Sequence, residues 1–253
     1  MAKEKYRLGL VSVSFRQNTP EEIVEAVKDS GLSFIEWGSD VHAPCHDFDR
    51  LHKIAALQRE YNIKCSSYGT YFRLGQTPIN CLEDHIAAAR VLGTDILRLW
   101  CGVKSGENYT DDERTELFEQ CRIAEKMARD AGVTLCTECH AGTFTERLDD
   151  ALLLMREIDS PHFRSYWQPF QTKTTDDNLI YAERIAPYAE HIHVFQWKGS
   201  ERFSLDCGID EWRAYLAKFD TPRTLLLEFM PDDNISTLKR EAVALKTIVG
   251  ETV

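Results

Sequence analysis

The feature that most constrains this chain is a repeated switch of its apolar pattern between the period of a strand and the period of a helix. In three places the order is the same: a threonine, a helical stretch, a glycine and then a strand. The threonines are Thr19, Thr77 and Thr110, and the glycines are Gly31, Gly93 and Gly132. Threonine caps a helix N-terminus through its side-chain oxygen, and glycine is a common C-terminal stop. Alternating strands and helices of this kind predict βα units and a parallel sheet.

Eight segments have the composition and spacing of strands, and helical stretches lie between them and after the last. These segments are 7–15, 34–37, 63–68, 95–101, 133–138, 163–168, 191–196 and 224–229. Eight βα units in about 250 residues is the size of a TIM barrel. A doubly wound open sheet is the alternative, but no GxGxxG or Walker-type glycine loop follows any of the strands. We therefore predict an α/β protein, a (β/α)8 TIM barrel with a single domain over residues 1–253.

Charge and hydropathy exclude several classes of partner. The net charge is −11, and Lys and Arg are scattered, so a nucleic-acid partner is not expected. The longest apolar runs are far shorter than the ~20 residues of a membrane span, and the N-terminus lacks the apolar region of a signal peptide. We therefore expect a cytoplasmic protein with no membrane contact, and a homo-oligomer is compatible with the sequence.

Eight cysteines are spread over predicted strands and helices, without the density of a disulfide scaffold. Cys136 and Cys139 form a CxxC, but the sequence has no second such pair. Alternation along a strand would point their side chains to opposite faces. We interpret them as two buried, reduced thiols and not as a zinc or redox site.

Polar residues gather at the C-terminal ends of the predicted strands, where the active site of a TIM barrel lies. They are Glu36, Arg98, Glu138, His140, Gln168, His191, His193 and Glu228. Alternation lets such side chains converge on one axial cavity, and carboxylate oxygens with imidazole nitrogen suit Mn²⁺, Co²⁺ or Zn²⁺. Each residue alone has a simpler interpretation, as a salt bridge or a core histidine. The set favours a metal site, because unpaired buried carboxylates are costly.

Aromatic residues cluster at the same predicted rim. Trp37, Trp100, Trp167 and Trp197 fall at strand ends or just beyond, with Tyr68 nearby. Aromatic faces beside carboxylates and amides suit a sugar, which stacks its C–H faces on rings and hydrogen bonds through its hydroxyls. Packing between strand ends and helices is the alternative for any one tryptophan. The expected partner is a small-molecule carbohydrate.

With these residues in place, the chain resembles the xylose isomerase-like TIM-barrel superfamily. It is similar in particular to the sugar phosphate isomerase/epimerase proteins, which include D-tagatose 3-epimerase. The resemblance spans nearly the whole chain, and the order and spacing of the motifs carry it. The motifs lie at residues 31–42, 67–75, 98–100, 137–140, 166–169, 191–195 and 227–228.

The resemblance implies one divalent ion, most simply Mn²⁺, with Co²⁺, Mg²⁺ or Zn²⁺ as alternatives. Its ligands would be Glu138, Gln168, His193 and Glu228. The family's Asp-x-x-His appears here as Gln168-Pro169-Phe170-Gln171. A glutamine oxygen can bind a metal, but one negative charge is lost, so the affinity should fall or the preferred ion change. His140 or water would be the substitute ligand.

The resemblance also implies a reaction, in which the metal polarises a ketose carbonyl and two glutamates exchange protons at the neighbouring carbon. Glu138 and Glu228 would be this acid/base pair, giving epimerisation or aldose–ketose exchange through an enediolate. The residues expected to contact the substrate are Glu36, His42, Tyr68, Arg98, Trp100, His140 and Trp197. Arg73 and Lys198 are interpreted as solvated surface charges, so a phosphorylated substrate is not expected.

Other functions fit parts of the same pattern. A lyase or dehydratase, or a deglycosylating enzyme acting on a keto-sugar, would use the same metal and bases. Gln168 and Gln171 leave open a metal-free carbohydrate-binding barrel. A relative of endonuclease IV with three zinc ions is a further class, but the charge and the number of ligands argue against it.

Overall fold

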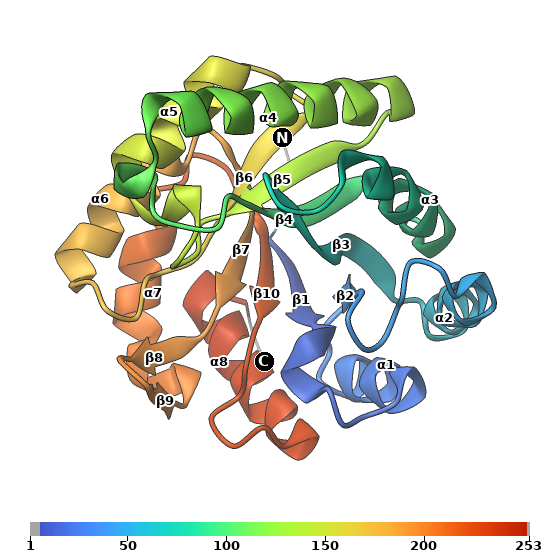
Figure 1. Cartoon of the computed structure of the whole chain (residues 1–253). Helices are drawn as coiled ribbons and strands as arrows, with labels where there is room; N and C mark the ends of the chain where they lie inside the picture. The colour runs from blue at the N-terminus through green and yellow to red at the C-terminus, as the bar shows by residue number, and fades with distance from the viewer. Residues whose placement is uncertain (1–5, 252–253) are drawn as a thin grey trace.

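A computed structural model of the chain describes residues 6–251 and shows a closed barrel of eight parallel strands (Figure 1). The barrel strands are β1 (Arg7–Val11), β2 (Phe34–Gly38), β3 (Lys64–Leu74), β4 (Ile96–Cys101), β5 (Thr134–Glu138), β6 (Phe163–Trp167), β7 (Ala189–Val194) and β10 (Thr224–Leu227). Consecutive barrel strands are neighbours, and β10 closes the ring by pairing with β1 in parallel register. The predicted (β/α)8 barrel is confirmed.

Within residues 6–251, eight α-helices follow the barrel strands, one after each. They surround the barrel (Figure 1). They are α1 (Pro20–Asp29), α2 (Phe48–Tyr61), α3 (Leu82–Leu92), α4 (Asp111–Ala131), α5 (Leu148–Ile158), α6 (Thr175–Ile185), α7 (Ile209–Leu216) and α8 (Leu238–Val249). Short 3-10 segments lie in the loops: Ser12–Phe15, Ile79–Cys81, Gly106–Asn108, Phe144–Glu146, Leu205–Gly208 and Ile235–Thr237. The helices bury their apolar stripes against the outer face of the strands, where most of the hydrophobic core lies.

The local signals at helix ends are confirmed in part. Thr19 and Thr110 each form a complete capping box, and Gly93 and Gly132 end their helices in the left-handed conformation. Thr77 is different: its hydroxyl accepts a hydrogen bond from the Arg73 backbone, and α3 begins five residues later. The interpretation of Thr77 as the cap of this helix is wrong, because a 3-10 turn intervenes.

Several predicted strand ends are also corrected. The third strand was expected to end at residue 68 but continues to Leu74, and the last was expected to reach residue 229 but ends at Leu227. The first strand was expected to reach residue 15, but it ends at Val11 and continues as a 3-10 turn. The seventh was expected to reach residue 196, but it ends at Val194. An antiparallel hairpin follows, made of β8 (Gln196–Lys198) and β9 (Glu201–Phe203). Gly199, with a φ of +59°, opens its two-residue turn, which is a favoured hairpin connection.

All eight cysteines lie in the described part of the chain and are free. Cys136 and Cys139 are both buried, as expected of structural thiols. Among the helices of residues 6–251, none is long and apolar enough to cross a membrane.

The two capping boxes should contribute measurably to stability. Because each threonine side chain accepts a bond from an otherwise unpaired helical N–H, Thr19→Ala and Thr110→Ala should each lower the free energy of unfolding by about 1 kcal/mol. Urea denaturation measures the loss. Thr172→Ala, an exposed threonine in a loop, is the control and should change little. Equal values for the three variants would contradict the capping assignment.

Candidate active site

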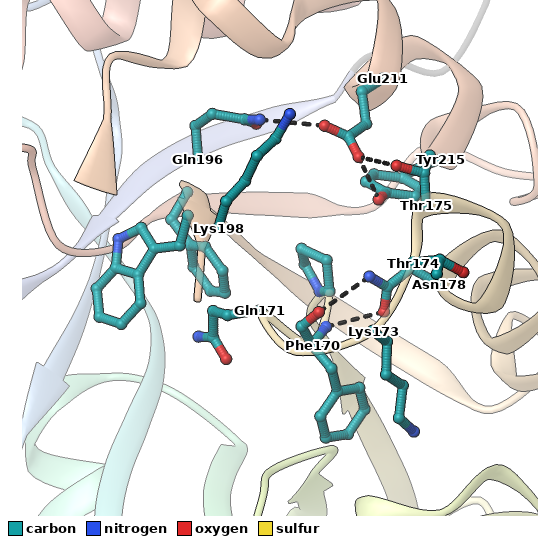
Figure 2. Close-up of a pocket in the computed structure, with 13 residues that line it drawn as sticks. Phe170, Gln171, Lys173, Thr174, Thr175, Asn178, Gln196, Lys198, Glu211 and Tyr215 are labelled. Atoms are coloured by element: carbon teal, nitrogen blue, oxygen red, sulfur yellow. Dashed lines mark hydrogen bonds between the residues drawn. The ribbon is translucent and has the colours of Figure 1, made fainter. Parts of the chain in front are cut away.

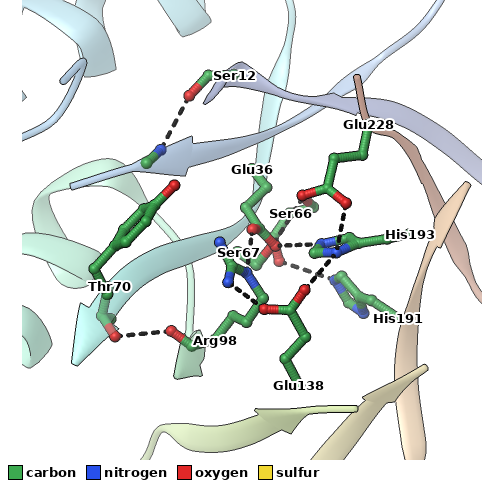
Figure 3. A network of polar contacts seen from close by, with 12 residues as sticks. Ser12, Glu36, Ser66, Ser67, Thr70, Arg98, Glu138, His191, His193 and Glu228 are labelled. Carbon is green, nitrogen blue, oxygen red and sulfur yellow. Dashed lines mark hydrogen bonds and ion pairs between the residues drawn. The ribbon is translucent and has the colours of Figure 1, made fainter. Parts of the chain in front are cut away.

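A buried ion-pair network lies inside the barrel, with Arg98 of β4 at its centre (Figure 3). Nε of Arg98 donates to Oε1 of Glu36 at 2.7 Å, and its Nη1 donates to Oε2 of Glu138 at 2.6 Å. The exposed fraction of all three residues is 2% or less. Ser67 donates a further bond of 2.9 Å to the other oxygen of Glu36. One guanidinium therefore orients two carboxylates and offsets one of their two negative charges, which would otherwise be costly to bury.

Gly69 of β3 makes room for this network. A Cβ atom at this position would lie 2.7 Å from Nη2 of Arg98 and 3.0 Å from Oε1 of Glu36. Gly69 pairs with Arg98 in the β3–β4 register, which places its backbone directly beside the ion pair. The absence of a side chain lets the guanidinium reach across β3 to β2.

A second group of side chains converges on His193 of β7. Its Nδ1 lies 3.3 Å from Oε1 of Glu138 and 3.5 Å from Oε2 of Glu228. The same nitrogen lies 3.4 Å from Oε1 of Gln168. On the other side of the ring, Nε2 lies 3.5 Å from Oε2 of Glu36. The structure thus brings together one nitrogen and three oxygens from β5, β7 and the segments that follow β6 and β10.

The charges of this cluster do not balance. Three carboxylates, those of Glu36, Glu138 and Glu228, surround one guanidinium, so the cluster carries −2 when His193 is neutral. Burial lowers the pKa of His193, but Glu228 and Glu36 outweigh burial and raise it to about 10. Burial raises the pKa of Glu36, yet Arg98 and His193 bring it down to about 2. The excess negative charge can be offset by a proton on His193 or Glu228, or by a metal ion.

The two glutamates nearest His193 have different surroundings. Burial opposes the charge of Glu138, but Arg98 keeps its pKa well below the usual range. Trp100 also donates to the Oε2 atom of Glu138 at 2.7 Å. For Glu228, burial raises the pKa, and the nearby charge of Glu138 adds to the increase while His193 opposes it.

The donor set fits a divalent cation. Ligand atoms of Glu138, His193 and Glu228 all lie within 4.8 Å of one another, and all three residues are buried. Two carboxylates, one imidazole and the amide oxygen of Gln168 are ligands that Mn²⁺, Co²⁺ and Zn²⁺ accept. On the other side of the imidazole, Nε2 of His193 lies 3.5 Å from Oε2 of Glu36 and forms no hydrogen bond within the described residues. Metal-binding histidines commonly have a carboxylate beside the ring nitrogen that does not bind the ion.

A cavity of about 260 Å³ opens above these residues at the C-terminal face of the barrel. Its lining combines the site with aromatic and polar rim residues: Arg16, Tyr71, Arg98, Trp100, Glu138, His140, Gln168, Gln171, Phe195, Trp197, Glu228 and Phe229. Tyr71 and Phe229 have φ values of +53° and +52°, the left-handed region that such residues seldom adopt. Strained backbone of this kind is concentrated at functional sites.

The sequence predicts eleven site residues, and five of them form the buried network at or beneath the cavity floor. These five are Glu36, Arg98, Glu138, His193 and Glu228. Gln168, Trp100, His140 and Trp197 also line the cavity. Glu36 does not line the cavity. Its carboxylate is surrounded by Arg98, Ser67 and His193.

His42 and Tyr68 lie away from the cavity lining. The ring of His42 contacts Oγ of Ser12 and the backbone oxygen of Asn18, each at 3.1 Å. The hydroxyl of Tyr68 donates to the backbone oxygen of Ala43 at 2.6 Å. Both side chains hold the loop after β2 in place.

His191 follows the simpler interpretation of a core histidine. It is buried, stacks on Tyr166 with ring centroids 5.0 Å apart, and its Nε2 lies 3.2 Å from the backbone oxygen of Ser66. Trp37 and Trp167 are likewise fully buried in the core and not at the rim.

Arg16 and Phe229 are cavity residues that the sequence analysis did not select. Arg16 donates to the hydroxyl of Tyr71 at 2.6 Å and to Asp40 at 3.0 Å, which ties the loops after β1 and β2 to the C-terminal part of β3. Their positions in the sequence indicate a place at the cavity, because Arg16 directly follows the first predicted strand and Phe229 ends the last.

Comparison with known proteins agrees with this fold. The family described as the xylose isomerase-like TIM barrel matches residues 24–246. The chain belongs to this family. It is also 20% identical, over 204 residues, to the 3-dehydroshikimate dehydratase of Bacillus anthracis, covering 75% of this chain and 70% of that protein.

Several solved structures share this fold. The probable 3-DHS dehydratase of Bacillus anthracis has a TM-score of 0.79 at 16% identity, covering 96% of this chain and 99% of that one. A D-psicose 3-epimerase from Clostridium cellulolyticum H10 has a TM-score of 0.71 at 15% identity, covering 97% and 100%. An L-ribulose 3-epimerase has a TM-score of 0.70 at 17% identity, covering 96% of each chain. At these identities the similarity establishes the shared barrel.

Removal of the central guanidinium should be strongly destabilising. Arg98→Met would leave Glu36 and Glu138 buried without their partner, so we expect a loss of about 3–5 kcal/mol in the free energy of unfolding. Lys126→Met, which breaks an exposed ion pair with Asp130, should cost less than about 1 kcal/mol. Urea denaturation of the two variants in metal-free buffer measures the difference. Similar losses for both would show that the network does not stabilise the barrel.

Proposed function

We propose that this chain is a divalent-metal-dependent enzyme that removes a proton next to the carbonyl of a keto-sugar or related polyol, and that it acts as an isomerase or epimerase. The observation that carries the proposal is the convergence of Glu138, Gln168 and Glu228 on Nδ1 of His193. This cluster lies at the floor of a cavity rimmed by aromatic side chains. Mn²⁺ is the ion we favour, and when bound it would act as a Lewis acid on the carbonyl and the adjacent hydroxyl.

In this proposal the two glutamates have distinct tasks. Glu228 takes the proton from the carbon next to the carbonyl. Within the described residues its carboxylate is not paired with an arginine or lysine, and burial raises its pKa, so it is the more basic of the two glutamates. Arg98 and Trp100 hold one oxygen of Glu138, which fixes the orientation of this carboxylate as the second member of the acid/base pair. Trp100, His140 and Trp197 contact the sugar at the rim.

A dehydratase is the second candidate function, and a specific observation favours it. The sequence relative and the structure with a TM-score of 0.79 are both described as 3-dehydroshikimate or 3-DHS dehydratases. Loss of water next to a carbonyl also begins with removal of a proton, so the same glutamate would start either reaction. The fate of the neighbouring hydroxyl group distinguishes the two.

Proton abstraction can be tested before the substrate is known. The chain loaded with Mn²⁺ is incubated in D₂O with D-fructose, D-tagatose, D-psicose, D-ribulose, D-xylulose and 3-dehydroshikimate. NMR records deuterium at the carbon next to the carbonyl, and ultraviolet absorbance records any unsaturated product. We expect exchange with at least one compound and its loss after chelation of the metal.

Variants of the two glutamates provide the control for this experiment. Glu228→Gln and Glu138→Gln should lower the exchange rate by a factor of about 10² or more, since a positioned acid or base contributes 10²–10⁴-fold. Glu183→Gln, an exposed glutamate of α6, should exchange at the parent rate. Exchange at the parent rate in both site variants, with metal bound normally, would refute the proposed chemistry.

The amide of Gln168 should limit the affinity for metal. The amide oxygen of Gln168 lies 3.4 Å from Nδ1 of His193. Gln168→Asp adds a negative charge at this corner of the site, so the dissociation constant for Mn²⁺ should fall by about tenfold. Gln171→Asp adds the same charge to the cavity without contact to His193 and should have a smaller effect. Isothermal titration calorimetry with Mn²⁺ alone measures both. A larger effect at residue 171 than at residue 168 would place the ion elsewhere.

A further inference from the structure

A second cavity, of about 300 Å³, adjoins the first at the same end of the barrel (Figure 2). The loop after β6, the hairpin β8–β9 and helices α6 and α7 contribute its walls. Gln171, Phe195 and Trp197 line both cavities, so the two spaces share a wall. The two cavities are therefore immediate neighbours at the mouth of the barrel.

A fixed polar network forms one side of the second cavity. The carboxylate of Glu211 accepts bonds from Thr175 at 2.6 Å, from Tyr215 at 2.8 Å and from Gln196 at 3.1 Å. Gln196 is buried against Gly208, where an added Cβ would lie 2.1 Å from its amide oxygen. These groups come from α6, α7 and the hairpin, and the bonds between them hold the surface of the cavity in one arrangement. None of them takes part in the network around Arg98.

The opposite side of the cavity is aromatic. Phe195 and Trp197 lie with ring centroids 5.3 Å apart, and Phe170 also lines the space. Gln171 lies between the two cavities, and among the described residues its side-chain amide has no hydrogen-bond partner within the protein. Ring faces opposite a hydrogen-bonding surface fit a polyhydroxylated ring.

The charges in the cavity argue against an anionic ligand. Nζ of Lys173 donates to the backbone oxygen of Glu146 at 2.9 Å and lies 4.2 Å from the centre of the Phe170 ring. Lys198, at the end of β8, lines the cavity on the side of Glu211. The N-terminus of α6 is occupied by the side chain of Thr174, which caps it. Lys173 and Lys198 lie at opposite sides of the cavity, so they do not form a single phosphate-binding group (Figure 2).

We infer that the second cavity is a glycosyl subsite, so that the substrate carries a second, uncharged sugar ring as a disaccharide or glycoside. The ring that reacts would lie above Glu138 and Glu228, and the second ring would lie between Trp197 and Glu211. This assignment of the reacting ring rests on the proposed function. The binding of a second ring does not.

Direct binding tests the subsite on the full chain with Mn²⁺ present. Saturation-transfer NMR and calorimetry compare D-glucose and D-fructose with maltose, cellobiose, lactose, sucrose and trehalose. We expect at least one disaccharide to bind ten times or more as tightly as either monosaccharide. Equal affinities, or no measurable binding of any of these disaccharides, would overturn the inference.

Two variants locate the second ring. Glu211→Gln should weaken binding of the preferred disaccharide by about tenfold, since it replaces a charged acceptor. Thr175→Phe, at an exposed position on the cavity wall, should block the second ring while monosaccharide affinity stays the same. Circular dichroism establishes that each variant is folded. Parent affinity for the disaccharide in both folded variants would also overturn the inference.

The outcomes separate the subsite from the proposed function. If Glu228→Gln retains deuterium exchange while disaccharides still bind preferentially, the chemistry is wrong and the subsite stands. If exchange depends on Glu228 but disaccharides bind no better than single sugars, the chemistry stands and the subsite fails.

Discussion

The rest of the site depends on the double ion pair of Arg98 with Glu36 and Glu138. A TIM-barrel interior is commonly filled with branched apolar side chains, and here a charged group takes their place. The guanidinium makes this possible only because Gly69 has no side chain, so that Arg98 can reach a carboxylate on either side. Through Glu36 and Glu138 the network then approaches both ring nitrogens of His193. Nε2 lies near Glu36, and Nδ1 lies near Glu138.

Much of the fold could be predicted because its signals are local. A threonine cap and a glycine stop act within one helical turn, so Thr110 and Gly132 mark the ends of α4 correctly. The errors arise where tertiary contacts decide. Thr77 has the sequence of a cap, but its hydroxyl bonds to Arg73 and a 3-10 turn delays the helix. The hairpin after β7 was missed, although Gly199-Ser200 is a turn signal, because the strand pattern was extended past Val194.

The candidate ligands could be placed together from the sequence because parallel strands end at one face and alternation fixes the direction of each side chain. That argument covers Glu138 and His193, which the structure finds 3.3 Å apart. It could not tell which polar residues face the cavity and which lie beneath it. Glu36 and Arg98 were both expected to contact a substrate. Their carboxylate and guanidinium pair with each other, and only Arg98 also lines the cavity. Loop residues such as His42 depend on contacts that no local pattern records.

The ion pair also gives a physical reason for glutamine at position 168. Arg98 and Glu36 cancel each other's charge, which leaves Glu138 and Glu228 as the two negative charges around Nδ1 of His193. A divalent cation among these groups makes a neutral centre when the fourth oxygen comes from an amide. An aspartate there would leave the buried centre with one uncompensated negative charge, which is costly in a site of low dielectric constant. Gln168 therefore suits a barrel in which a buried carboxylate already stands behind the histidine, and the substitution that first argued against a metal is consistent with one.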